Sequence, residues 1–114
     1  MKHIKLVVNN DKIKRKEEFF IKKELQCILN LYAKMVSNGS WKDYAFSTGS
    51  REVSFDVYQR TSEKPVIRIT KNLKPKYSNE KFFIKDRNGN VLNKSENLNY
   101  LISKTSWNKL RLVK

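Results

Sequence analysis

Residues 29–45 read LNLYAKMVSNGSWKDYA, which contains the end of a helix, a glycine cap, a tryptophan and the start of a strand. Apolar residues in and before this stretch recur at three- and four-residue steps, the period of a buried helical stripe. The stripe comprises Ile21, Leu25, Ile28, Tyr32, Met35 and Val36. Asn38-Gly39 supplies the left-handed residue that commonly ends a helix. The sequence therefore predicts a long helix over residues 19–37 that lies across a sheet.

Strand signals follow this helix, because apolar and polar residues alternate between short turn sequences. The expected strands are residues 42–47, 52–60, 66–71, 81–85 and 91–93. In the second of these, Val53, Phe55 and Val57 share one face. Asn88-Gly89 predicts a hairpin turn between the last two.

The C-terminal part adds a short helix and a last strand. Ser95 is a suitable N-cap for a helix that continues to about Lys104, and residues 109–113 alternate like a strand. The expected fold class is α+β, with the long N-terminal helix packed on a mostly antiparallel sheet of about five to six strands. We expect residues 1–18 to form a basic N-terminal arm and residues 19–114 to form a single domain.

Several segments of this chain resemble a known family. Besides residues 29–45, they are Arg60–Pro65, Arg68-Ile69, residues 88–92 and residues 109–113, in matching order and spacing. These segments are similar to an alphaproteobacterial family that is defined only as a domain of unknown function, number 2794. The resemblance covers about residues 19–114 and implies a small, stand-alone cytoplasmic domain. It carries no catalytic or binding residues with it.

The chain is strongly basic, with 25 Lys and Arg against 11 Asp and Glu and a net charge of +14. Such a charge favours a polyanionic partner, with nucleic acid ahead of an anionic membrane. The alternative is an AT-rich genome, whose codons enrich Lys, Asn, Ile, Tyr and Phe without selection for any partner. No apolar run approaches the roughly 18–20 residues of a membrane span.

Enzymatic signals are weak in this sequence. The single histidine, His3, has no positioned partner that would make it a general base. One histidine and one cysteine cannot supply the ligands of a zinc site, and isolated glycines do not form a phosphate-binding loop. Cys27 is expected to be a partly buried structural residue and fits a reducing cytoplasm. We therefore expect a non-enzymatic protein without a cofactor or a metal.

The basic residues form three candidate binding surfaces. The first is the most basic segment, which also contains Tyr77 and Phe83; its cations are Lys71, Lys74, Lys76, Lys81, Lys85 and Arg87. Basic side chains beside an aromatic ring can hold phosphates and stack a base. The second is the arm with Lys12, Lys14, Arg15 and Lys16. Both segments have a simpler interpretation as solvated surface.

The third candidate is the outward face of the sheet, where Tyr58, Arg60, Arg68 and Arg51 could share one surface. Arginine offers a planar fork for phosphate or carboxylate. Because Glu52, Asp56 and Glu63 lie in the same stretch, cross-strand pairing between Arg and carboxylate is the competing interpretation.

The leading hypothesis from the sequence is a small basic module that binds RNA, or a ribonucleoprotein particle such as the ribosome, mainly through phosphates. The alternative is a protein–protein interaction adaptor whose charge reflects genome bias. Its contact would be Tyr58 with its neighbouring arginines, or Trp41 if that ring were exposed rather than packed in the core. The sequence does not determine the oligomeric state.

Overall fold

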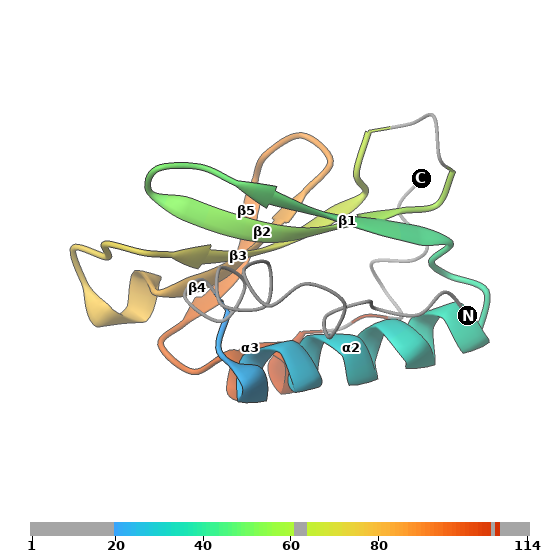
Figure 1. The fold of residues 1–114 in the computed structure, drawn as a ribbon, viewed down its shortest axis with the longest axis horizontal. Helices are drawn as coiled ribbons and strands as arrows, with labels where there is room; N and C mark the ends of the chain where they lie inside the picture. Colours follow the sequence, from blue (N-terminus) through green and yellow to red (C-terminus); the bar gives the residue numbers. More distant parts are fainter. Residues whose placement is uncertain (1–19, 61–63, 106, 108–114) are drawn as a thin grey trace, which may run out of the picture.

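The computed structural model describes residues 20–60, 64–105 and 107. The elements in this part are α2 (Lys22–Ser37), β1 (Asp43–Thr48), β2 (Glu52–Tyr58), β3 (Ile67–Asn72), the 3-10 helix η1 (Ser78–Glu80), β4 (Phe82–Asp86), β5 (Val91–Ser95) and α3 (Leu98–Lys104). The five strands form one antiparallel sheet in the order β1-β2-β3-β4-β5. Both helices lie on the same side of this sheet (Figure 1). The expected α+β class is therefore confirmed.

The meander decides which loops are neighbours. Because each strand pairs with the next, alternate connections lie at the same end of the sheet. The β1–β2 turn and the connection that carries η1 share one end, on the left in Figure 1. A hydrogen bond joins these two connections, from the N–H of Leu73 to the carbonyl of Arg51 at 2.7 Å. The β2–β3 and β4–β5 connections lie at the opposite end.

Helix α2 ends as the Asn38-Gly39 sequence predicts. Gly39 has a φ of 82°, which is in the left-handed region that glycine adopts without a steric penalty. Its N–H donates to the carbonyl of Val36 at 3.0 Å, and the N–H of Ser40 donates to that of Met35 at 2.9 Å. These two bonds form a Schellman motif, which satisfies carbonyls that the helix end would otherwise leave unpaired.

The core lies between α2 and the inner face of the sheet. The helix contributes mainly Leu25, Ile28, Leu31, Tyr32 and Met35, all of which are buried. The predicted inward residues Val53, Phe55 and Val57 are 0–2% exposed. Aromatic rings fill the space between them, and the Tyr44 and Phe55 rings stack at a centroid distance of 5.1 Å.

Two boundary predictions need correction. Ile21 precedes α2 and is 48% exposed, so it does not belong to the buried stripe. The N-cap of α3 is Asn97 rather than Ser95, because the Asn97 side chain accepts the Tyr100 N–H at 2.8 Å. Ser95 instead ends β5 and accepts the Asn97 N–H.

The expected arm (1–18) and last strand (109–113) lie outside the described residues. None of the helices in the described part is long and apolar enough to cross a membrane.

Candidate nucleic-acid interface

Lys71 was expected to bind phosphate, but it points into the molecule and is 8% exposed. It follows Ile67 and Ile69 at the two-residue period of β3, so its side chain falls on the inner face. There its ammonium lies 2.9 Å from the carboxylate of Glu24, in the first turn of α2. Lys71 therefore connects the sheet to the helix and is removed from the candidate interface.

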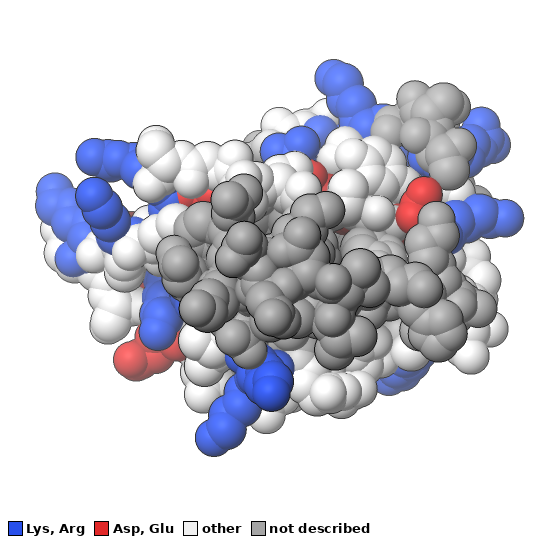
Figure 2. Space-filling view, viewed as in Figure 1, with Lys and Arg blue, Asp and Glu red and all other residues white. Residues whose placement is uncertain are grey.

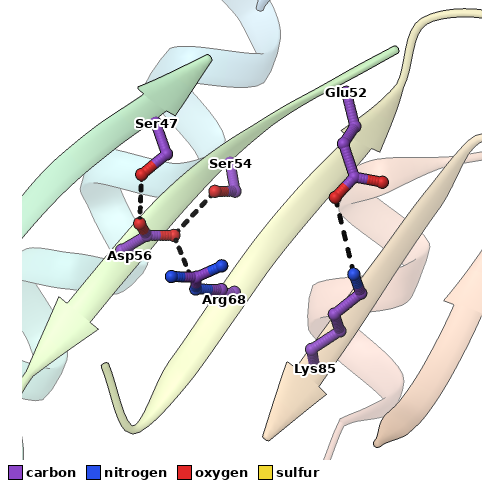
Figure 3. Close-up of polar contacts among 6 residues, drawn as sticks. All are labelled: Ser47, Glu52, Ser54, Asp56, Arg68 and Lys85. Carbon is purple, nitrogen blue, oxygen red and sulfur yellow. Dashed lines mark hydrogen bonds and ion pairs between the residues drawn. The ribbon is translucent and has the colours of Figure 1, made fainter. Parts of the chain in front are cut away.

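The outer face of the sheet carries a network of charged and hydroxyl groups (Figure 3). The carboxylate of Asp56 is 1% exposed and accepts hydrogen bonds from Ser47 at 2.5 Å and Ser54 at 2.7 Å. Nε of Arg68 lies 3.5 Å from the same carboxylate. Cross-strand pairing with a carboxylate, the competing interpretation, therefore accounts for Arg68.

Lys85 is also paired on this face. Its ammonium is 3.4 Å from Glu52 on β2 and 5.1 Å from the centre of the Phe83 ring (Figure 3). Because Lys85 is on β4, its side chain must cross β3 to reach Glu52. Thr70 on β3 is only 1% exposed. The apolar part of a lysine side chain that crosses a strand can cover a residue such as this one. Like Arg68, Lys85 has its charge compensated by the sheet itself.

The remaining predicted arginines do not share one surface. Arg51 precedes β2, whereas Arg60 follows it, so the length of a strand separates them. Tyr58, at the end of β2, is half-buried. Arg87 lies in the β4–β5 turn, at the opposite end of the sheet from Arg51.

The carboxylate of Asp86 shapes that β4–β5 turn. It accepts the backbone N–H groups of Asn88 and Asn90, both at 2.9 Å. Burial acts to raise the pKa of Asp86, but the hydrogen bonds from Asn90, Asn88 and Gly89 outweigh it and lower that pKa. Asp86 is therefore engaged within its own turn.

Four of the basic residues lie on the two neighbouring connections at the η1 end of the sheet. We call this surface the basic end; it consists of Arg51, Lys74, Lys76 and Lys81. Backbone hydrogen bonds hold these segments together. The N–H of Leu73 donates to the carbonyl of Arg51, and the N–H of Asn72 donates to the carbonyl of Lys81 at 2.7 Å. Figure 2 shows Lys and Arg side chains gathered at this edge, on the left.

In the part of the chain that the structure describes, the cations of the basic end have no acidic partner. Among the described residues, the ion pairs are those of Arg68, Lys71 and Lys85, and none involves the basic end. Lys81 lies 5.5 Å from the centre of the Phe82 ring, and Lys76 lies 5.8 Å from that of Tyr77. The Tyr77 ring itself is 60% exposed. Arg51, Lys74 and Lys76 are exposed and Lys81 is half-buried, so the basic end offers three exposed cations and one aromatic ring to solvent.

The sequence predicts Arg51 on the outer face of the sheet, whereas in the structure it lies at the basic end. The available signal was the meander, which places the turn at residues 49–51 beside the connection at residues 73–81. Lys14, Arg15 and Lys16 of the predicted arm lie outside the described residues.

Trp41 is not an interface residue in this structure. It is 4% exposed and packs edge-to-face on Trp107 at a centroid distance of 5.6 Å. The Trp107 Nε1–H donates to the carbonyl of Ile102 at 2.9 Å. The two indoles close one end of the core, as the packing alternative for Trp41 expected, and the adaptor hypothesis loses one of its proposed contacts.

Cys27 is half-buried on the flank of α2, as predicted. Its thiol donates to the Asn99 side-chain oxygen at 3.5 Å, and burial raises its pKa. A raised pKa keeps a thiol protonated and less nucleophilic.

Comparison with known proteins identifies the family. The model of the family described as "Protein of unknown function (DUF2794)" matches residues 18–102, and the chain belongs to this family. No curated protein and no solved structure matches the chain.

Proposed function

We propose that this protein is a non-enzymatic module that binds RNA, or a ribonucleoprotein particle such as the ribosome, through phosphate contacts at the basic end. The observation that supports this proposal is that four cations without an acidic partner among the described residues lie on neighbouring connections at one end of the sheet. Lys71, Arg68 and Lys85 are paired with carboxylates, whereas the cations of the basic end have no acidic partner in the described part of the chain.

Unpaired lysines suit phosphate better than they suit a protein partner. Lysine is a flexible point charge that follows a phosphate backbone without demanding one geometry, and phosphate contacts supply most sequence-independent affinity. With three lysines and one arginine, the basic end is expected to bind RNA with little sequence preference.

The proposal also includes the compartment in which the protein acts. We place the protein in the cytoplasm of an alphaproteobacterium, where RNA is abundant. The single cysteine, which is free, supports a reducing compartment.

The test is RNA affinity after charge reversal at two exposed lysines. Lys74→Glu/Lys76→Glu is expected to weaken binding of a mixed-sequence RNA by about tenfold or more at 0.15 M salt, because two phosphate contacts become repulsive. The matched control is Lys42→Glu/Lys64→Glu, which changes the net charge equally at the opposite end of the sheet, where both lysines are exposed.

The control is expected to retain most of the affinity. Equal weakening by both double variants would show that the net charge, and not the basic end, determines binding. RNA binding too weak to detect in the parent protein would refute the proposed function itself.

A further inference from the structure

Among the described residues, the ring of Tyr77 takes no part in the hydrophobic core. It is 60% exposed and does not belong to the core cluster or to the hydrophobic residues packed against it. In the described part of the chain its ring contact is the one with Lys76. A large apolar ring that is left in solvent beside unpaired cations suggests a ligand that uses both.

The backbone that carries this ring is held in place. The carbonyl of Tyr77 accepts the N–H of Glu80 at 2.9 Å, and the N–H of Lys81 donates to Ser78 at 3.1 Å. These bonds form η1 immediately after Tyr77, and Pro75 restricts the chain just before it. A ring on a fixed support loses little conformational entropy when it binds a ligand.

We propose that the basic end binds single-stranded RNA more tightly than double-stranded RNA, with one base stacked on the Tyr77 ring and the adjoining phosphate on Lys76. This inference rests on the proposed function and specifies its substrate. A base in a duplex is already stacked on its neighbours and presents no free face, whereas an unpaired base can stack on an exposed aromatic ring. The Lys76 ammonium lies over the ring, 5.8 Å from its centre, so the base would stack on the opposite face of the ring.

A second tyrosine provides a matched control. Tyr100 on α3 is 59% exposed, and Lys104 lies 5.1 Å from its ring centre. The ammonium of Lys104, however, donates to the carbonyl of Lys94 at 3.0 Å and so is already engaged. We therefore expect Tyr77, and not Tyr100, to stack a base.

The experiment measures the affinity of the full chain for an unstructured 12-nucleotide RNA and for the 12-base-pair duplex of the same sequence. Tyr77→Ala is expected to weaken single-strand binding by about fivefold to a hundredfold, the range for loss of one stacked base. Duplex binding should change by less than about twofold, and Tyr77→Phe should retain single-strand affinity, since stacking needs the ring alone. Tyr100→Ala should bind like the parent.

The outcomes separate this inference from the proposed function. If Tyr77→Ala leaves single-strand affinity unchanged, or weakens single strand and duplex equally, the stacking inference is wrong. The phosphate-binding function still stands in that case if Lys74→Glu/Lys76→Glu weakens both ligands. If the parent binds neither RNA, both fail.

Discussion

The ammonium group of Lys71 lies 2.9 Å from the carboxylate of Glu24, and this ion pair joins β3 to the first turn of α2. Both side chains are nearly covered, at 10% and 12% exposure. The same Glu24 oxygen accepts the backbone N–H of Ile21 at 2.9 Å, just before the helix starts. One carboxylate therefore both satisfies an unpaired donor at the helix N-terminus and compensates a buried lysine.

Removal of one partner of this pair is expected to destabilise the fold strongly. Glu24→Gln leaves the Lys71 ammonium buried without a counter-charge and should lower the free energy of unfolding by about 3 kcal/mol. The double variant Glu24→Gln/Lys71→Met removes both charges and should recover much of that loss. Urea unfolding of Glu24→Gln, Lys71→Met and the double variant measures this coupling; strictly additive effects would show that the two residues do not stabilise each other.

Arg68 is expected to contribute little to RNA binding, although it is a half-exposed arginine in a basic protein. Its charge is offset by the Asp56 carboxylate, which two serine hydroxyls hold in place. Arg68→Ala should therefore leave RNA affinity within about twofold of the parent, because no phosphate contact is lost. A loss of RNA affinity as large as that of Lys74→Glu/Lys76→Glu would show that the outer sheet face is part of the RNA interface.

Alkaline pH should weaken the fold through Tyr32. Burial, followed by the negative charge of Asp43, raises the pKa of Tyr32 above its ordinary value of 10.0. Because the folded pKa exceeds the unfolded one, this contribution to stability is complete below about pH 10 and is lost as the pH rises through the folded pKa.

The variant Tyr32→Phe isolates that effect. It removes the ionisable group and only a long hydrogen bond, the 3.4 Å contact to the Lys42 carbonyl. Thermal unfolding from pH 8 to pH 11 should show a smaller loss of stability at alkaline pH in the variant than in the parent. Parallel pH profiles would contradict this assignment.

Gly39→Ala should destabilise the protein by about 1 kcal/mol, because the φ of 82° disfavours any residue with a β-carbon. A β-carbon at this position would meet no atom within 4 Å, so the cost is one of backbone conformation and not of packing. Gly49→Ala is a suitable control, since Gly49 lies in a turn without a positive φ. A Gly39→Ala variant as stable as the parent would show that the backbone at the end of α2 accommodates alanine without a measurable cost.

The sequence predicted the elements well because their signals are local. The helix period, the Asn38-Gly39 cap and the alternation of Val53, Phe55 and Val57 each depend on neighbouring residues, and the structure agrees with all three. The N-cap of α3 was misplaced because Ser95 and Asn97 are both good cap residues, and their backbone geometry decides between them.

The candidate site was harder to predict because pairing between charges is a tertiary property. Lys71 looked like part of a basic loop, yet its register in β3 turns it toward Glu24, which is 47 residues away in sequence. The distant contacts of Lys85 with Glu52 and of Arg51 with the η1 connection likewise appear only once the sheet is assembled.

The most direct test of the proposed function is the salt dependence of RNA affinity, measured for the parent protein and for Lys74→Glu/Lys76→Glu. Engagement of four phosphates on a single strand predicts that log K falls with log salt with a slope of about −3. The double variant should have a slope that is smaller by about 1.4, since two contacts are lost. A slope near zero in the parent, or an equal slope in both proteins, would contradict phosphate binding at the basic end.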